Sequence, residues 1–339
     1  MREYKKTIIG SAILLLLLAA SFLYPAYGPA DFNKQIFVKD EQGNILDKAP
    51  FPPSEKHILG TDRNGQDMHL LFLYGAKFTL IIAFVVSSFR VLVGGVVGLF
   101  MSLWAPYLKS YFKDFFITMR YIPLIFLGIV LMGPTIGAVT DLPLASVVSF
   151  QVLMLVFIGI PTVTIFASEI TEQLLAQSFV QSSYLMGASK FHIFRRQLMP
   201  YIRSYGILLF VQQLLSTLQL TMHLGIFGLF LGGQAVGGIF GYLEPPPKPA
   251  SLSMEWAGLI AQNFNDFNMA PWTIFVPIGG FFIVIFIVNM MKKELEENIF
   301  GEQLSKVSRK KKLDIPKASL LPTKGGFEFV NKQQSRIEG

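Results

Sequence analysis

One charged residue lies deep inside a long apolar run of the sequence. Arg90 is near the middle of residues 78–104, where a charge costs roughly 2.5–3.5 kcal/mol on membrane-insertion scales and must face protein, water or an anion. None of the apolar runs offers an interior acid to pair with it. Two interpretations follow: an anion contact, such as a carboxylate, along a polar path, or a guanidinium that snorkels or caps backbone carbonyls inside a helix bundle.

A later apolar run contains four polar residues at steps of four, three and four, which share one face of a helix. They are Gln212, Ser216, Gln219 and His223. A lone polar residue in a membrane helix usually contacts another helix, whereas a stripe of four favours the wall of a polar cavity. A proton relay at His223 is weakly supported, because no acid accompanies it.

Residues suited to metal, redox or hydrolytic chemistry are scarce. The chain has no cysteine and only four histidines, which excludes disulfides and argues against a metal centre. Residues 60–65 superficially suggest a phosphate loop, but Gln66-Asp67 follows where such a loop needs Lys and Ser or Thr. The apolar runs contain neither an aspartate pair nor a serine nucleophile motif, so an intramembrane protease is not supported. We expect no metal or cofactor to be bound by this chain.

The composition predicts the elements that position these residues. Of 339 residues, 52% are hydrophobic and 15% charged, against roughly 25% charged in soluble domains. Six apolar runs approach or exceed the roughly 20 residues that cross a bilayer. They cover residues 7–27, 78–104, 115–133, 142–167, 205–232 and 273–291. We predict an all-α membrane protein with six transmembrane helices, the first an uncleaved anchor rather than a signal peptide.

Lysine and arginine predict the orientation of these helices, because they gather on the cytoplasmic side. Both terminal segments, the loop near Lys109 and the segment 169–203 are rich in bases. The loop 28–75 has seven acids against five bases, and the loop 233–272 has Lys248 as its single base. We therefore expect both termini in the cytoplasm. The net charge of +7 lies largely in the C-terminal tail and does not indicate nucleic acid.

The segment 169–203 is polar and amphipathic. Its apolar positions follow steps of four and three, which predicts one helical face. These positions are Val180, Tyr184, Gly187, Phe191, Phe194 and Leu198, and the other face carries Lys190, Arg195 and Arg196. A cytoplasmic helix of this kind usually binds a soluble partner protein. The alternative is an interfacial helix lying on the membrane.

The spacing within this segment resembles a family motif. Gln181-Ser182-Ser183, then Gly187, then Pro200 is similar to the Glu-Ala-Ala loop of bacterial ABC importer permeases. In that family the loop forms a short coupling helix that docks in a groove on the cytoplasmic ATPase. The resemblance implies an ATPase-coupling role for these residues and for Ala188 and Ser189, with Gly187 at the turn between two helical pieces.

A second motif occurs far upstream. Residues 57–67, His-Ile-Leu-Gly-Thr-Asp-Arg-Asn-Gly-Gln-Asp, resemble the signature His-Pro-Leu-Gly-Thr-Asp-x-x-Gly-Arg-Asp of the peptide/nickel branch, specifically of permeases like the oligopeptide "C" subunit. The matching residues include Gly60, Thr61, Asp62, Gly65 and Asp67. We interpret them as a polar elbow that leads into the second span, rather than as a solute contact. The resemblance covers roughly residues 7–291.

The chain also departs from the family pattern. It has Gln181-Ser182-Ser183 in place of Glu-Ala-Ala, Gln197 where isoleucine is common, and Gln66 for the usual arginine. The fold needs none of the family residues at these positions. The contact with an ATPase is therefore either tuned to a particular partner or weakened.

The resemblance implies a type I ABC importer transmembrane-domain fold in the bacterial cytoplasmic membrane. It divides the chain into an N-terminal part with the first helix and an extracytoplasmic loop (1–76), a permease core (77–291) with the coupling loop 169–203, and a basic tail (292–339) near anionic lipid. The implied partners are a second homologous permease, two cytoplasmic ATPase subunits and an extracytoplasmic solute-binding protein. ATP is then hydrolysed by the partner subunits, and this chain is not an enzyme.

The implied function is to form a translocation path for peptides and to couple it to ATP hydrolysis. Two alternatives remain open. The same machinery could import nickel, a metallophore or an oligosaccharide, because the solute-binding protein largely sets the solute in this branch. The chain could instead be a degenerate scaffold subunit that does not transport.

Two further expectations concern packing. Gly94 and Gly98, and the later glycines 228, 232, 233, 237 and 241, have the spacing of close helix contacts, and the later ones could also give a gate its flexibility. Residues 253–264 predict a short helix at the outer face, with Trp256 at the membrane interface.

Overall fold

The computed structural model describes residues 4–135, 143–232, 234–235, 250–251 and 253–313. Long helices dominate it: α1 (Lys5–Tyr27), α2 (Met68–Leu103), α5 (Leu144–Leu175), α8 (Met199–Ile226) and α10 (Trp272–Leu313). Shorter helices are α3 (Pro106–Tyr121), α4 (Leu124–Met132), α6 (Ser178–Leu185), α7 (Lys190–His192) and α9 (Trp256–Asn263). Short helical turns cover Gly133–Thr135, Ile193–Leu198 and Phe264–Asp266.

The strands are short and form two antiparallel pairs. β1 (Phe37–Lys39) pairs with β2 (Ile45–Lys48), and β3 (Gln234–Ala235) pairs with β4 (Ala250–Ser251). Neither pair contributes to a core sheet. The predicted all-α class is confirmed.

Within the described ranges, five helices are long and apolar enough to cross a membrane, so the chain is a multi-pass membrane protein. The prediction of a continuous helix over 115–133 is wrong. α3 ends at Tyr121 and Ile122 is extended (φ −80°, ψ 119°), because the residue before a proline is driven out of the helical region. After Pro123 the chain continues as a shorter apolar helix, Leu124–Thr135. The third predicted span is therefore a broken helix.

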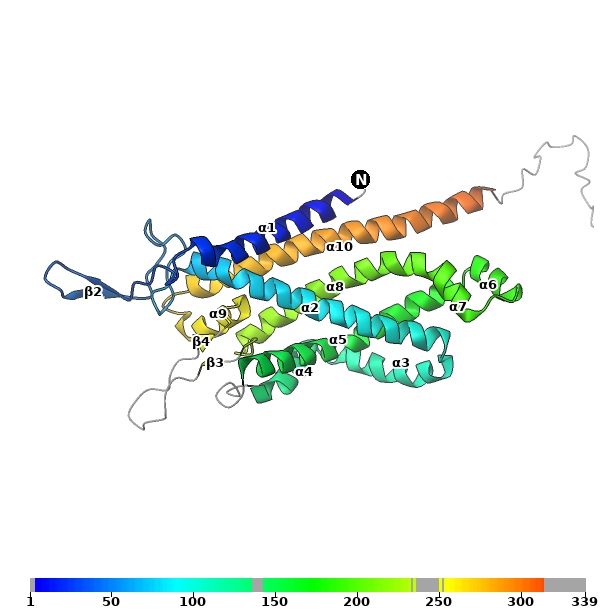
Figure 1. Cartoon of the computed structure of the whole chain (residues 1–339), viewed down its shortest axis with the longest axis horizontal. Coiled ribbons are helices and arrows are strands. Elements are labelled where there is room, and N and C mark those ends of the chain that lie inside the picture. Colours follow the sequence, from blue (N-terminus) through cyan, green and yellow to red (C-terminus); the bar gives the residue numbers. More distant parts are fainter. Residues whose placement is uncertain (1–3, 136–142, 233, 236–249, 252, 314–339) are drawn as a thin grey trace, which may run out of the picture. The chain divides into compact units, whose positions relative to one another are not determined.

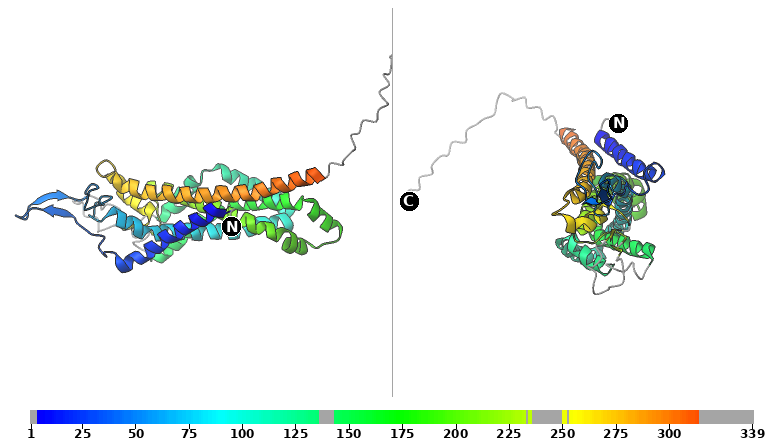
Figure 2. Two further views of the ribbon diagram at one scale, coloured as in Figure 1. Left: turned by 90° about the horizontal axis from the view of Figure 1, so that it is seen from above. Right: turned by 90° about the vertical axis from the view of Figure 1, so that its left-hand side faces the viewer.

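Residues Met1–Ile299 form one compact unit. In it, α2 packs along α5 and also against α1 and α8, while α9 packs against α8 (Figure 1). The β1–β2 hairpin lies at the end of the bundle where α2 begins, and α6 and α7 lie at the opposite end (Figures 1 and 2). We call these the elbow end and the loop end. The second unit is Phe300–Gly339, of which residues 300–313 are described, as the last part of α10.

The contact between α2 and α5 is close because glycines face it. A Cβ on Gly94 would lie 2.7 Å from Cβ of Val163, and a Cβ on Gly98 would lie 2.5 Å from the carbonyl oxygen of Thr164. Any side chain at either position would push the two helices apart. The predicted role of these two glycines in helix packing is confirmed.

The prediction for residues 253–264, a short helix at the outer face, is confirmed in part. A short helix is present as α9, but Trp256 is not at the membrane interface: it is fully buried. Its ring stacks on Phe72 at 4.8 Å between centroids, and its Nε1 donates to the Phe72 carbonyl oxygen at 2.8 Å. Burial of so large a ring outweighs its preference for an interface. Glycines 233, 237 and 241 and the tail beyond Leu313 lie outside the described residues.

The predicted part boundaries fall inside helices. Residues 76 and 77 both belong to α2, and residues 291 and 292 both belong to α10. The compact unit therefore includes the first helix together with residues 77–291.

The N-terminus of α1 is capped by a carboxylate from far along the chain. Glu294 of α10 accepts hydrogen bonds from the backbone N–H groups of Lys6 (2.9 Å) and Thr7 (2.6 Å) and from the Thr7 hydroxyl (2.7 Å). The first N–H groups of a helix have no partner within it, and negative charge is favourable there. Glu294 thus attaches α1 to α10.

We expect Glu294→Ala to lower the stability of the purified chain by roughly 0.5–2 kcal/mol, the usual loss for a helix cap. Glu297→Ala is the matched control, because Glu297 lies on the same helix and is exposed. The measurement is the thermal unfolding midpoint in detergent. Equal midpoints for the two variants would contradict the capping role.

Candidate functional site

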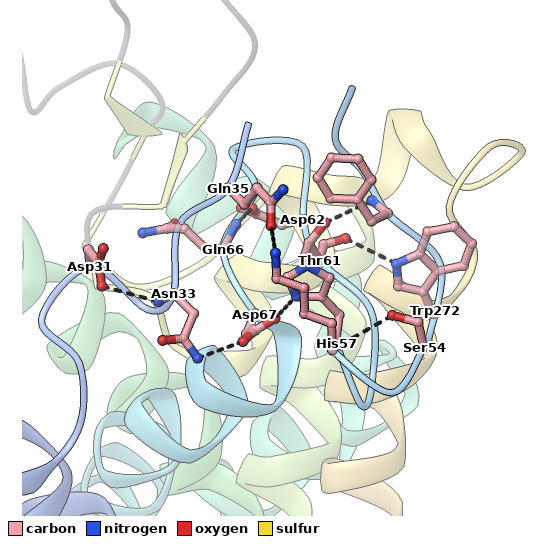
Figure 3. A network of polar contacts seen from close by, with 12 residues as sticks. Asp31, Asn33, Gln35, Ser54, His57, Thr61, Asp62, Gln66, Asp67 and Trp272 are labelled. Carbon is pink, nitrogen blue, oxygen red and sulfur yellow. Dashed lines mark hydrogen bonds and ion pairs between the residues drawn. The ribbon is translucent and has the colours of Figure 1, made fainter. Parts of the chain in front are cut away.

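The signature residues 57–67 fold into a tight elbow immediately before α2 (Figure 3). His57 Nδ1 lies 2.5 Å from Asp67 Oδ1, and both side chains are buried. The second oxygen of Asp67 accepts a hydrogen bond from Nδ2 of Asn33 at 3.0 Å. Asp67 therefore joins three separate stretches of the loop at the point where α2 begins.

Thr61 and Asp62 connect the elbow to other elements. The Phe51 backbone N–H donates to Thr61 Oγ1 at 2.8 Å, and Trp272 Nε1, at the start of α10, donates to the Thr61 carbonyl oxygen at 3.0 Å. Asp62 accepts from the backbone N–H of Gln66 at 2.8 Å and from Nε2 of Gln262 on α9 at 3.3 Å. The elbow thus joins the ends of α2, α9 and α10.

The charges of the elbow are withdrawn from solvent. Asp62 is fully buried, and this burial raises the pKa of its carboxyl group. Burial likewise lowers the pKa of Arg63, whose guanidinium lies 3.8 Å from Oδ2 of Asp266. Because both signature aspartates are buried and hydrogen-bonded within the chain, the geometry favours the polar elbow over a direct solute contact.

Two signature glycines have backbone conformations that other residues rarely adopt. Gly60 has φ +75° and Gly65 has φ +78°. At Gly65 a Cβ would also lie 2.1 Å from the carbonyl oxygen of Gln35. The motif therefore requires glycine at position 65 for two separate reasons.

At the loop end, the predicted coupling segment forms two helical pieces separated by a turn. α6 ends at Leu185, and Gly187 has φ +83°. Ser189 then caps α7 by accepting a hydrogen bond from the His192 N–H at 3.3 Å. Pro200 lies in the first turn of α8, directly after the π-helix Ile193–Leu198.

Two of the departures from the family pattern contact each other. Gln197 Nε2 donates to the hydroxyl of Ser183, which links α6 to the turn before α8. Gln181 Nε2 donates to the carbonyl oxygen of Leu175 at the end of α5, at 3.1 Å. The polar substitutions at 181, 183 and 197 thus fix the internal geometry of the loop.

The prediction of one apolar face along this segment is wrong. Val180, Ile193 and Leu198 are buried, whereas Phe191 is 61% exposed. The chain reverses at Gly187, and Ile193–Leu198 is a π-helix, so the helical phase is not preserved from one piece to the next.

The turn instead presents two apolar residues that the sequence analysis missed. Leu185 is 90% exposed and Met186 is 80% exposed, directly before Gly187. They lie off the predicted apolar face. The signal that could have revealed them is their position immediately before a turn glycine.

Arg90 caps a backbone carbonyl inside the bundle, which is the second of its two interpretations. Its Nε and one terminal nitrogen donate to the Leu155 carbonyl oxygen on α5, at 2.9 and 2.6 Å. The other terminal nitrogen donates to Thr217 Oγ1 at 3.2 Å and to Gln213 Oε1 at 3.4 Å. Arg90 is fully buried, so it does not line an open path in this chain.

The polar stripe on α8 lies apart from Arg90. Gln219 and His223 are exposed, and Ser216 is half-buried. Gln212 donates to Oε1 of Glu296 on α10 at 3.1 Å. The residues that meet Arg90 are Gln213 and Thr217, one position further along, and the sequence analysis missed both.

A buried acid near α9 was also missed. Glu255 is 1% exposed and accepts a hydrogen bond from the Leu231 N–H at 2.8 Å. Burial raises the pKa of its carboxyl group to about 7. The helix predicted over residues 253–264 was expected at the outer face, where a glutamate would face solvent, so Glu255 carried no signal of burial.

Comparisons with known proteins were made on the whole chain. No protein-family model matches it. The dipeptide transport system permease protein DppC of Alkalihalophilus pseudofirmus is 22% identical over 292 residues, which cover 84% of each chain. The glutathione transport system permease protein GsiD of Pectobacterium atrosepticum is 24% identical over 290 residues, covering 86% of this chain and 85% of the relative.

A third relative extends the same pattern. The oligopeptide transport system permease protein OppC of Lactococcus lactis subsp. cremoris is 24% identical over 301 residues, covering 87% of this chain and 92% of the relative. This chain is similar to permease subunits of peptide and glutathione transport systems. The resemblance that the two motifs indicated is therefore confirmed.

Gly65 provides a test of why the signature motif requires glycine at this position. We expect Gly65→Ala in this permease-like chain to destabilise it by roughly 2–5 kcal/mol, the sum of a left-handed backbone and a steric overlap. Gly43→Ala is the matched control, because Gly43 has φ +87° but no atom within 4 Å of its Cβ position. It should cost roughly 1–2 kcal/mol. Thermal unfolding in detergent measures both, and equal losses would contradict the close approach of Gln35.

The pKa of Glu255 predicts a pH-dependent stability. A glutamate pKa raised from 4.5 to about 7 means that the folded chain binds this proton more tightly than the unfolded chain. Stability should therefore fall as pH rises from about 4.5 to about 7, by roughly 3 kcal/mol from this group. Unfolding midpoints across this range should show a decline that Glu255→Gln reduces. If the unfolding midpoint of Glu255→Gln depends on pH as that of the parent chain does, Glu255 is not the group responsible for the decline.

Proposed function

We propose that this chain is the membrane-spanning permease subunit of an ATP-driven importer in the bacterial cytoplasmic membrane, and that it forms part of a translocation path for peptides or a similar small solute. Its relatives are named for dipeptide, oligopeptide and glutathione transport. The observation that carries the proposal beyond similarity is the exposed apolar turn at Leu185 and Met186 beside Gly187.

This turn has the properties of a docking site for a soluble protein. Two large apolar side chains project at the end of a short helix that is held at two other positions: Val180 is buried in the loop-end core, and Ser183 is bonded to Gln197. A rigid element with exposed apolar residues suits insertion into a groove. We propose that the occupant is a cytoplasmic ATPase subunit, with a second ATPase bound to a second, homologous permease.

The orientation follows from the same assignment. With the loop end in the cytoplasm, both termini are cytoplasmic, as the lysine and arginine placement predicts. The elbow end and the β1–β2 hairpin then face outward, where a solute-binding protein would deliver its cargo.

The exposed stripe on α8 provides a surface for the path. Gln219 and His223 are polar side chains on an apolar helix, and both are exposed when the chain is considered without partner subunits. Polar residues inside a membrane face protein or a water-filled cavity. We propose that they line a cavity completed by the second permease, while Arg90 maintains the fold behind them. ATP binding by the ATPase subunits would bias the two states of the path, with no cofactor bound by this chain.

The decisive experiment is ATP hydrolysis by the purified complex, reconstituted with its binding protein. We expect Leu185→Glu to lower solute-stimulated hydrolysis at least about tenfold, because a charge buried in an apolar groove costs more than the roughly 1.4 kcal/mol that a tenfold change represents. The ATPase should also be lost during purification.

Leu46→Glu is the matched control: Leu46 is 67% exposed, but it lies on the hairpin at the elbow end. It should leave ATPase retention unchanged, and also the hydrolysis measured without the binding protein, because the hairpin lies at the opposite end from the proposed ATPase contact. If no ATPase co-purifies with the native chain, or if Leu185→Glu behaves like the control, the chain is a scaffold and not a transport subunit.

A further inference from the structure

The chain leaves the helical path after α8 and forms a short buried segment, residues 228–232, at the elbow end (Figure 1). Leu229, Phe230 and Leu231 are each buried. A glycine with positive φ stands at either end, Gly228 at +75° and Gly232 at +92°. Since glycine changes between such conformations at little cost, the segment has a potential hinge at each end.

Gln151 of α5 holds this segment from one side. Its Nε2 donates to the carbonyl oxygen of Phe230 at 3.1 Å, and its Oε1 accepts from the N–H of Gly232 at 3.0 Å. Nε2 also donates to Thr135 Oγ1 at 3.0 Å. The buried side-chain amide of Gln151 thus pairs with one carbonyl oxygen and one N–H group of the segment's backbone.

Residues that precede α9 hold it from the other side. The N–H of Leu231 donates to Oε1 of Glu255 at 2.8 Å, and the carbonyl oxygen of Leu231 accepts from the Ser253 hydroxyl at 2.6 Å. Buried backbone groups without partners are costly. Because these partners are side chains of other elements, the segment cannot shift without losing several bonds together. Such an arrangement favours two discrete states over a gradual displacement.

The surroundings of Glu255 are apolar. Its pocket is lined by Met132 and Leu155 from α4 and α5, by Thr221 and Leu224 from α8, and by the segment itself. It has no room for a water molecule, and its described lining contains no other charged or titratable group. The nearby contacts from α2 and α9 are likewise uncharged: Thr79 Oγ1 accepts from the N–H of Trp256. A carboxylate here would have neither a cation nor water to stabilise it.

We propose that residues 228–232 form a gate segment at the elbow end of the translocation path, and that Gln151 and Glu255 are positioning residues that hold it closed, Glu255 in its neutral form. This proposal rests on the proposed transport function. Ionised Glu255 gains hydration when the segment moves away, so loss of its proton favours release. Its pKa of about 7 places this change near neutral pH.

The test uses the absence of cysteine from the natural chain. Leu231→Cys is introduced into the assembled complex in nanodiscs, and its rate of reaction with a water-soluble maleimide is measured about one pH unit below and above the pKa of about 7. Across this interval the ionised fraction of the group rises about tenfold. Leu46→Cys, on the exposed hairpin, measures the pH dependence of the thiol chemistry itself.

We expect labelling of Leu231→Cys, divided by that of the reference, to rise about five- to tenfold with pH. Adding Glu255→Gln should hold it low at both pH values, because the amide oxygen can still accept from Leu231 but the group cannot ionise. Adding Gln151→Met should raise it at both. Glu41→Gln, an exposed acid of the hairpin, should leave the rise intact.

The proposal fails if Glu255→Gln retains the rise, or if the parent shows none. Leu229→Cys serves as a second reporter, so that a defect caused by one cysteine substitution is recognised. Labelling needs no hydrolysis: if the gate behaves as expected and no ATPase binds, the proposed function fails and the gate remains. If the binding protein stimulates hydrolysis but labelling does not depend on pH, the gate proposal fails and the proposed function remains.

Discussion

The contact between α2 and α5 is the constraint on which the rest of the bundle depends. Gly94 and Gly98 on α2 remove the side chains that would separate the two helices, and Gly159 on α5 does the same opposite Arg90. A Cβ on Gly159 would lie 2.1 Å from Arg90 Nε. The guanidinium fits there because the glycine leaves the space, and its bonds to the Leu155 carbonyl offset the burial of its charge.

This contact also determines where α8 lies. The remaining nitrogen of Arg90 bonds to Gln213 and Thr217, so α8 turns that side toward α2 and α5. Gln219 and His223 are then left exposed. The polar stripe is therefore a consequence of the buried arginine, although the two never meet. Of the two interpretations that the sequence allowed for this charge, the structure shows the backbone cap, and the same guanidinium also sets the rotation of the helix that carries the stripe.

The sequence predicted what depends on local pattern and failed where distant residues decide. The apolar periodicity predicted the helices, and the glycine pair of α2 predicted the close packing. The motifs predicted the elbow. They could not predict that Gln262 and Trp272 would complete the elbow, because those residues lie about 200 positions away from it. Nor could they predict the burial of Glu255 or Trp256, which follows from α9 packing against α8 and α2. Pro123 was visible, and its effect on the third span was underestimated.

The loop end shows how residues that depart from the family pattern bond to one another and to a neighbouring helix. The family glutamate and alanines are replaced by Gln181, Ser182 and Ser183, and these substitutions would weaken the loop if they acted alone. Gln181 instead bonds the end of α5, and Ser183 bonds Gln197, the other unusual residue. Because Gln197 precedes α8 and Gln181 follows α5, the turn at Gly187 is fixed to both helices. A force applied at Leu185 therefore reaches α5 and α8 together, and through α5 the glycine-packed contact with α2. That is the mechanical property that the proposed coupling role requires, and here it comes from polar side chains that the family pattern does not contain.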